Sequence, residues 1–317
     1  MSRIILHIGP GKCGSSSIQS ALIGGSDTHS KLVNAHFFPP SLFRKLDTPH
    51  PTPETIAQVY AFIENAQSAG TTKPLLLSHE IMFKLVTALV NLSKIACDLA
   101  DEVIAIAYVR RQSDFMVSSF GQWFFRSPER ILESANTLRD HNIDPTLFWG
   151  VERHLIAAAL GGMHHARQLS GHLHFDWSQS ISERIEALTP LGVSMSVGLL
   201  PHAGTNFPLI PDFLTRAGVI FDTDHGAEST QKMTAESIKN PSYHPSIIQA
   251  VVDTIEAGHS MPGPHAANVF FNHPNTPRIQ NFNTNTALLS LLKDHIDTIF
   301  EQKNVQLAKS LNLPPEY

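Results

Sequence analysis

Near the amino terminus, the sequence gathers the residue types that bind phosphate groups. An apolar run at residues 4–8 is followed by a glycine-rich segment made of Gly9, Pro10, Gly11, Lys12, Cys13, Gly14, Ser15, Ser16 and Ser17. Glycine lets the backbone take positive φ and bring its N–H groups close to an anion. A helix that begins at Ser15 or Ser16 directs its first N–H groups and the positive end of its dipole toward the same place. Because Lys12 adds a full positive charge, the segment predicts a phosphate-binding loop between a strand and a helix.

Two known phosphate-loop patterns fit this segment only in part. The loop of nucleotide triphosphatases, G-x-x-x-x-G-K-[ST], has its lysine after the last glycine. Here Lys12 comes before Gly14, and Ser15 stands where that pattern needs its lysine. The dinucleotide pattern G-x-G-x-x-G matches residues 9–14, but no acidic residue follows a second strand about twenty residues later. The segment is therefore typical of neither class.

Residues 9–19 resemble the 5′-phosphosulfate loop of the sulfotransferases that use 3′-phosphoadenosine 5′-phosphosulfate (PAPS). That loop has the form P-K-x-G-T-T, and in a bacterial branch the form G-P-x-K-x-G-[ST]-[ST]-S-[IL]-Q, which this segment follows closely. The resemblance implies that Lys12 contacts the bridging oxygen and the transferring sulfuryl group. It also implies that the 5′-phosphate is bound by Gly11, Cys13, Gly14, Ser15, Ser16 and Ser17.

A second segment resembles the 3′-phosphate motif of the same family, in which an arginine ends a buried strand and a serine follows on the next helix. The apolar run 103–109 leads into Arg110, and Ser118 comes eight residues later. A planar guanidinium can fork onto phosphate oxygens while the serine reaches them from the other side. Arg111 and Ser119 have the same spacing, so this register is the alternative. Taken without the resemblance, both arginines are surface charges after a strand.

Sulfuryl transfer also needs a base that takes the proton of the acceptor hydroxyl. His79 and Glu80 follow the apolar run 74–78, at the edge where a parallel sheet binds its ligands. Similar bacterial sulfotransferases carry Ser-x-Glu at this point, which Ser78, His79 and Glu80 match. We therefore expect Glu80 to be the base, with His79 as the alternative. A carboxylate that only stabilises the start of the next helix is equally compatible with the sequence.

The elements that must position these residues alternate in the order typical of a parallel sheet. Apolar runs at 73–78, 103–109 and 192–200 predict buried strands. Helical patterns cover 16–23, 54–69, 113–125, 245–256 and 286–307, with Ser113 as the expected N-cap of the third. This alternation predicts an α/β fold with a parallel β-sheet flanked by helices, and the resemblance implies a P-loop NTPase-like three-layer sandwich. We expect one sulfotransferase-like domain over 1–317, with 121–190 as a mostly helical insertion on the acceptor side.

Composition narrows the function classes. The 317 residues are 42% hydrophobic and 16% charged, as in ordinary globular proteins. A net charge of −5 argues against broad nucleic-acid binding. Two cysteines, Cys13 and Cys97, are too few for a disulfide framework and fit a reducing compartment. Because we find neither a signal-peptide pattern nor a long uninterrupted apolar run, we expect no transmembrane segment and a cytoplasmic location.

Other chemistry-bearing residues have simpler interpretations. His7 lies within the first strand and is expected to be a histidine of the core. Cys13 is expected to fill space in the loop rather than to react. A histidine-rich segment has spacings that match no zinc site, so an exposed or acceptor-contacting face is expected for His164, His165, His172 and His174.

Together these observations favour a sulfotransferase that moves the sulfuryl group of PAPS in line to a hydroxyl on a carbohydrate, a lipid or a small metabolite. In such a transfer catalysis is mainly positioning and charge neutralisation, and no metal is expected. The alternatives are a P-loop kinase and a nucleotide-binding protein without catalysis. A kinase would need a lysine after Gly14 and a carboxylate that holds magnesium.

Overall fold

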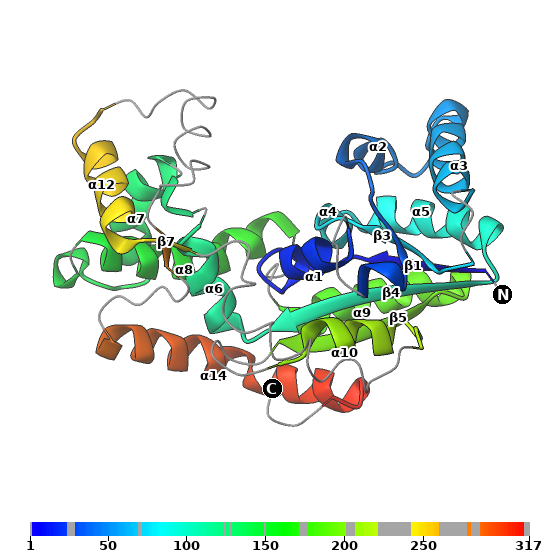
Figure 1. Ribbon diagram of the computed structural model, residues 1–317. Coiled ribbons are helices and arrows are strands. Elements are labelled where there is room, and N and C mark those ends of the chain that lie inside the picture. The colour runs from blue at the N-terminus through cyan, green and yellow to red at the C-terminus, as the bar shows by residue number, and fades with distance from the viewer. Residues whose placement is uncertain are drawn as a thin grey trace. The chain divides into compact units, whose positions relative to one another are not determined.

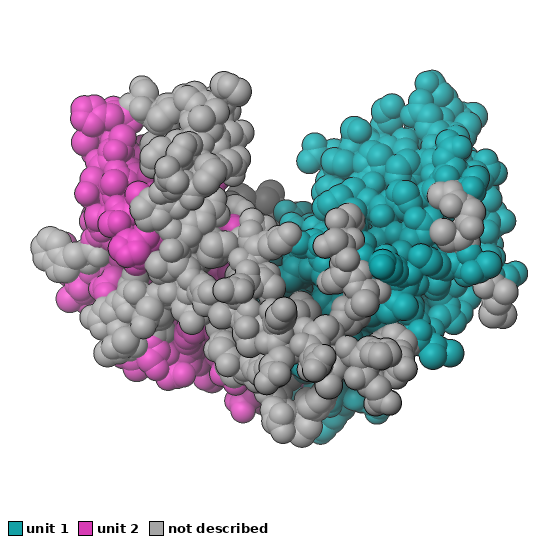
Figure 2. Space-filling view, viewed as in Figure 1, with its two compact units in different colours: residues 1–110, 177–239, 305–317 teal, residues 111–176, 240–304 magenta. Residues whose placement is uncertain are grey.

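The computed structural model (Figure 1) is described for most of the chain. The described residues are 2–23, 29–68, 72–122, 124–126, 128–148, 150–170, 176–200, 207–220, 242–259, 278–279 and 286–313. Their contacts divide the chain into two compact units, shown in teal and magenta in Figure 2. The first unit comprises 1–110, 177–239 and 305–317, and the second comprises 111–176 and 240–304. The expectation of a single domain with a helical insertion stays a prediction.

A five-stranded sheet forms the centre of the first unit, and all of its strands are parallel. Its order is β2-β3-β1-β4-β5, with bounds β1 Arg3–His7, β2 Asn34–Phe37, β3 Leu75–Ser78, β4 Glu102–Arg110 and β5 Ser194–Leu200. The central strands are almost wholly buried, which explains their continuous apolar runs. The predicted α/β fold with a parallel sheet is confirmed, and the strand order is consistent with a P-loop-like sandwich.

Helices cover the sheet in two groups (Figure 1). α5 contacts α3 and α9, whereas α1 contacts α10. Right-handed crossovers between parallel strands place the first group on one face and the second group on the other. The bounds in this unit are α1 Ser15–Leu22, α2 Pro40–Lys45, α3 Pro53–Gln67, α4 Ile81–Lys84, α5 Val86–Leu99, α9 Trp177–Leu188 and α10 Leu209–Arg216.

The second unit is mainly helical. α7, α8 and α12 pack against one another, and a two-stranded antiparallel pair joins β6 to β7. The bounds are α6 Gln112–Phe120, α7 Pro128–Asp140, α8 Gly150–Ser170, β6 Ser242–Tyr243, α12 Pro245–Glu256, β7 Arg278–Ile279 and α14 Thr286–Ser310, whose last residues belong to the first unit. Nowhere in the described ranges is a helix both long and apolar enough to cross a membrane.

The helix predicted over 113–125 is wrong at both ends. α6 ends at Phe120 because the carbonyl of Gly121 accepts the N–H of Tyr243, at 3.0 Å, and a separate 3₁₀ turn follows at 124–126. Ser113 is not the N-cap, since the helix begins one residue earlier and Ser113 lies inside its first turn. The Ser113 hydroxyl instead donates to Asp297 Oδ2 at 2.9 Å.

A partly buried polar cluster fixes α10 to the sheet. The Tyr108 hydroxyl donates to Asp212 Oδ2 at 2.5 Å, and Arg216 Nε donates to the same oxygen at 2.7 Å. Arg216 Nη1 also donates to the Val197 carbonyl at 2.8 Å. The Tyr108 ring lies against Gly198 on the neighbouring strand, where a Cβ atom would come 2.2 Å from Cε1 of the ring. Gly198 is therefore needed for the tyrosine to reach α10.

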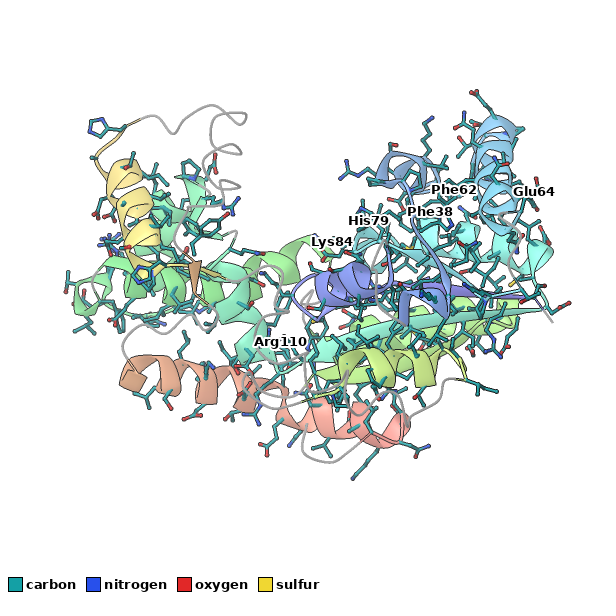
Figure 3. All side chains as sticks on the ribbon, viewed as in Figure 1. Phe38, Phe62, Glu64, His79, Lys84 and Arg110 are labelled. Carbon is teal, nitrogen blue, oxygen red and sulfur yellow. The ribbon has the colours of Figure 1, made fainter. Side chains whose placement is uncertain are left out.

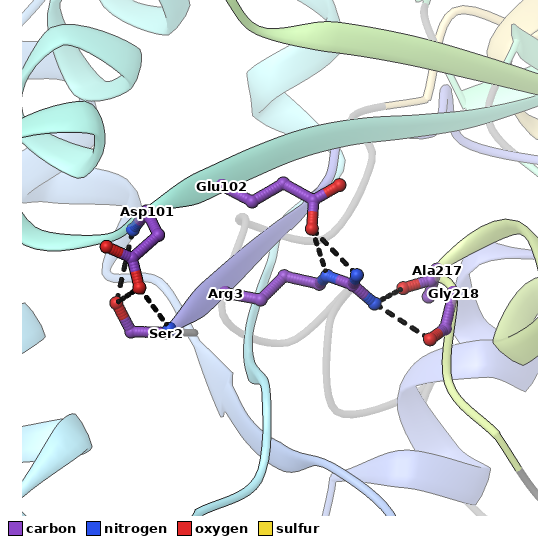
Figure 4. A network of polar contacts seen from close by, with 6 residues as sticks. All are labelled: Ser2, Arg3, Asp101, Glu102, Ala217 and Gly218. Atoms are coloured by element: carbon purple, nitrogen blue, oxygen red, sulfur yellow. Dashed lines mark hydrogen bonds and ion pairs between the residues drawn. The ribbon is translucent and has the colours of Figure 1, made fainter.

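The far end of α10 is held by a second network (Figure 4). Arg3 of β1 forms an ion pair with Glu102, at 2.7 Å, and donates through Nη1 to the carbonyls of Ala217 and Gly218, at 2.9 and 2.8 Å. These partners come from β4 and from the residues that follow α10. The helix is thus tied to three different strands.

We predict that Gly198→Ala destabilises the protein by about 1–3 kcal/mol, the usual cost of overpacking a core. The added methyl group overlaps the Tyr108 ring, which cannot move without releasing Asp212. The measurement is the free energy of unfolding from urea titration. Ser196→Ala, on the same strand, is the control and should change that free energy by no more than about 0.5 kcal/mol. Equal effects of the two substitutions would contradict the role assigned to Gly198.

Candidate anion-binding and catalytic site

The glycine-rich loop leaves β1 in an unusual backbone conformation. Lys12 has φ of 66° and Gly14 has φ of 82°, so both lie in the left-handed region. A lysine rarely occupies that region, and residues held there cluster at functional sites. The Cys13 N–H bonds the Pro10 carbonyl at 3.3 Å and closes the turn. The loop predicted from its glycines is therefore present, and Lys12 is constrained by it.

α1 begins at Ser15, directly after the loop, as predicted. The Ser15 hydroxyl is buried and lies 3.2 Å from the Gly9 carbonyl and 3.1 Å from that of Pro10, so it supports the loop from inside. Ser16 and Ser17 are partly exposed, as are Gly11 and Lys12. The first turn of the helix directs its N–H groups out of the helix and toward the loop. Gly14 is its N-cap and packs against Leu200 and Leu209.

A buried polar group lies beneath the loop. His7 Nδ1 and the Ser78 hydroxyl are 2.7 Å apart, and Gln19 Nε2 donates to the same hydroxyl at 3.1 Å. A Cβ atom on Gly9 would lie 3.0 Å from His7 Nε2, so the ring lies directly under that glycine. Burial lowers the pKa of His7 from 6.5 to about 3. The expected core histidine is thus neutral, although its buried Nε2 has no hydrogen bond among the described residues.

Three predicted site residues meet around the buried thiol of Cys13. Burial raises the pKa of this thiol to about 12, and the charges of Arg110, Glu80 and Lys12 all act on it. Arg110 Nη1 donates to the Lys12 carbonyl at 3.2 Å, so the guanidinium touches the loop. These residues follow or end β1, β3 and β4, which are neighbours in the sheet. Figure 3 labels Arg110 and His79. A thiol with a raised pKa is a poor nucleophile, as expected for a space-filling Cys13.

The hydrogen bonds of His79 and Glu80 separate the two candidate bases. His79 Nδ1 accepts the N–H of Ile81 at 3.0 Å, which places the proton of the neutral ring on Nε2. His79 therefore has no nitrogen lone pair available to act as a base in this arrangement. Glu80 is the N-cap of α4 by position, but its side chain makes no capping hydrogen bond. Burial raises the pKa of Glu80, while the charges of Lys12 and Lys84 oppose that rise.

Two side chains of α9, which the sequence reasoning missed, hold this part of the site. Trp177 Nε1 donates to the Arg110 carbonyl at 2.6 Å, at the end of β4. Arg184 is buried, donates through Nε to the Phe83 carbonyl at 2.9 Å, and lies with its guanidinium 4.0 Å from the Phe83 ring centroid. One helix thus holds both the strand that ends at Arg110 and the short helix that follows Glu80.

The second unit contains the remaining residues of the predicted 3′-phosphate motif. Arg111 Nη1 lies 3.4 Å from Asp297 Oδ2, so this arginine is engaged in an ion pair on α14. Ser119 is fully buried, whereas Ser118 is partly exposed. In the register of Arg110 with Ser118, the arginine contacts the loop and the serine is partly exposed. In the register of Arg111 with Ser119, the arginine pairs with Asp297 and the serine is buried. Their proposed binding roles stay predictions.

Metal-binding residues do not gather in the described ranges: no group of three or more His, Cys, Asp or Glu side chains there could hold an ion. The histidine-rich segment falls outside what the structure describes, because the side chains of His164 and His165 and all of His172 and His174 are excluded. The expectation for that segment stays a prediction.

The sequence matches no protein-family model, and it matches neither a curated protein nor a solved structure. The structure itself shows an α/β fold and a group of charged side chains at one edge of a parallel sheet. A functional assignment therefore depends on the chemistry of these side chains and on the resemblance of two short segments.

We predict that His7 makes the protein less stable as the pH falls. Its pKa of about 3 in the folded protein is below the unfolded value of 6.5, so the unfolded chain takes up the proton first. Between these values the free energy of unfolding should fall with decreasing pH, by about 1.4 kcal/mol per pH unit from this group. Urea titrations of the wild type and His7→Gln at pH 7, 6 and 5 measure the difference.

In His7→Gln that contribution should disappear, leaving a shallower pH dependence. His259→Gln is the control, because His259 is exposed and lies in the other unit. Equal slopes for wild type and His7→Gln would show that His7 is not held neutral.

Proposed function

We propose that this protein is a sulfotransferase that moves the sulfuryl group from PAPS to a hydroxyl acceptor. The observation that carries the proposal is the meeting of Lys12, Glu80 and Arg110 around one loop, with Arg110 Nη1 3.2 Å from the Lys12 carbonyl. In open parallel sheets, ligands bind at the edge where these residues lie. The resemblance of residues 9–19 and 108–118 to the two phosphate motifs of PAPS-dependent sulfotransferases supports the choice of donor.

The charges at this edge suit an in-line transfer. The acceptor oxygen forms a bond to sulfur while the bond from sulfur to the phosphate oxygen breaks, which leaves a sulfate ester and 3′-phosphoadenosine 5′-phosphate. Lys12 would stabilise the negative charge that develops on the departing oxygen, and the N–H groups at the start of α1 would bind the 5′-phosphate. Arg110 would bind the 3′-phosphate, because a guanidinium has several donors and can hold a carbonyl and phosphate oxygens together.

Glu80 is the proposed base. A carboxyl group with a pKa raised by burial holds a proton more strongly than an exposed one, which makes it a better proton acceptor in the transition state. His79 keeps Nδ1 on the Ile81 amide, so its Nε2–H can donate to the acceptor and orient its hydroxyl. The proton of the acceptor would pass to Glu80 as the bond to sulfur forms.

The rival functions are a P-loop kinase and a nucleotide-binding protein without catalysis. A kinase is disfavoured because Ser15 stands where its loop needs a lysine, and the Ser15 hydroxyl is engaged with loop carbonyls. A protein without catalysis would not need a half-buried carboxyl group on which the charge of Lys12 acts. Each rival predicts a different response to nucleotides.

We predict that 3′,5′-adenosine diphosphate raises the melting temperature, while ATP with magnesium and NAD leave it nearly unchanged. A ligand present at about 100 times its dissociation constant stabilises the folded state by about 2.7 kcal/mol. Thermal-shift assays with the three nucleotides measure this. Lys12→Met, which keeps the length of the side chain without its charge, should reduce the shift. A larger shift with ATP and magnesium than with 3′,5′-adenosine diphosphate would favour the kinase.

We predict that Arg110→Ala weakens binding of 3′,5′-adenosine diphosphate by about 10- to 150-fold, the range for a lost hydrogen bond to a charged group. Arg111→Ala serves as the matched control, since its guanidinium pairs with Asp297, and it should change the dissociation constant by less than about threefold. Isothermal titration calorimetry compares the two. Equal losses would favour the register with Arg111 and Ser119.

A further inference from the structure

An exposed aromatic side chain lies beside the proposed base. Phe37 ends β2 and pairs in register with Ser78, the last residue of β3. Its side chain is 52% exposed, and its ring centroid lies 6.4 Å from that of His79 in an edge arrangement. An exposed aromatic ring beside a polar site offers a face against which the ring of a ligand can pack.

The backbone fixes the direction of Phe37. Phe38, the next residue, is fully buried, and its ring packs edge-on against Phe43 and Phe62, with centroids 6.1 and 5.2 Å away. Because neighbouring residues in extended chain point to opposite sides, the buried Phe38 turns Phe37 outward. The Phe38 N–H donates to the Ser78 carbonyl at 3.2 Å, which holds this part of the chain next to β3.

Two exposed cations, Arg44 and Lys84, act electrostatically on His79 and Glu80 respectively. The charge of Arg44, on α2, contributes to the lowered pKa of His79, and that of Lys84, the last residue of α4, opposes the rise in the pKa of Glu80. His79 and Lys84 are both labelled in Figure 3. Arg44 and Lys84 are exposed, and within the described part of the chain neither side chain has a hydrogen bond or an ion pair.

The chain as a whole has a net charge of −5, so positive charge near His79 and Glu80 is not a general property of the protein. Phe43 of α2 packs on Phe38, so α2 presents Arg44 from an anchored helix. The charge of Lys12, in the loop proposed to bind the nucleotide, also acts on Glu80. Arg44 and Lys84 are thus additional positive charges, placed near the two residues proposed to contact the acceptor hydroxyl.

We propose that Phe37, Arg44 and Lys84 bind the acceptor, and that the acceptor is a hydroxyl-bearing ring with an acidic group. The ring would pack against Phe37, the acidic group would lie near the two cations, and the hydroxyl would face His79 and Glu80. This deepens the proposed function, because the transfer step depends on that function. Binding of the ring acid does not, since it needs no nucleotide.

The test uses two probes with the same phenol ring: 4-hydroxyphenylacetate, and the neutral 2-(4-hydroxyphenyl)ethanol, in which a hydroxymethyl group replaces the carboxylate. Their binding to the full chain is measured by NMR titration without nucleotide. We expect the acid to bind more tightly at low salt, and the difference to shrink at about 0.5 M salt, where exposed charges are screened. Arg44→Gln and Lys84→Gln should each weaken binding of the acid by about two- to fivefold and leave the alcohol unchanged.

Phe37→Ala should weaken binding of both probes by about two- to tenfold, since both present a ring. The control variants are Lys45→Gln, next to Arg44 on α2, and Lys94→Gln on α5, which remove the same charge elsewhere. Neither control should change binding of the acid. Circular dichroism of each variant verifies that it is folded.

Several outcomes would overturn the inference. These are equal binding of acid and alcohol at low salt, no binding of the acid at about 10 mM, and losses in Lys45→Gln as large as in Arg44→Gln. Titration of the same variants with 3′,5′-adenosine diphosphate separates this inference from the proposed function. Binding of the acid without binding of the nucleotide would contradict the sulfotransferase proposal and support the ring-acid site. Binding of the nucleotide without binding of the acid would support the sulfotransferase proposal and contradict the ring-acid site.

Discussion

The hydrogen bond from Arg110 Nη1 to the Lys12 carbonyl is the contact on which the site depends. It joins the last residue of β4 to a lysine that the loop holds at positive φ. The loop is also held at its base, where Ser15 contacts the Gly9 and Pro10 carbonyls, and by the bond from the Cys13 N–H to the Pro10 carbonyl. The guanidinium of Arg110 thus contacts the loop at the residue that carries the second cation. This contact is possible because the carboxyl ends of parallel strands lie at one edge of the sheet.

Burial shifts the pKa of three groups at this edge toward their uncharged forms. His7 is neutral because its ring lies beneath the loop, and Cys13 keeps its proton for the same reason. Glu80 also has a raised pKa, but Lys12 and Lys84 limit that rise. The site therefore holds a half-buried carboxyl group, on which the charges of Lys12 and Lys84 act, together with a histidine and a thiol that are uncharged at neutral pH. That arrangement suits a proton transfer.

The sequence predicted the elements that depend on local pattern. β3 and β4 followed from their apolar runs, and α12 has the predicted bounds. The meeting of Lys12, Glu80 and Arg110 at one edge followed from strand ends in a parallel sheet. The early end of α6 could not be predicted, because Tyr243, distant in the sequence, takes the Gly121 carbonyl. Trp177 and Arg184 were missed because they donate hydrogen bonds to backbone carbonyls, and every residue has a carbonyl, so no residue pattern indicates such a contact.

The burial of Cys13 has a consequence for how the protein meets oxidants. Peroxides and alkylating reagents attack the thiolate, and its population is negligible when the pKa of a thiol is about 12. Cys97 is less buried, and its pKa is raised as well, by burial and then by the charge of Asp98. Oxidative stress should therefore leave the turn around Lys12 chemically intact, even though a sulfur atom lies at its centre.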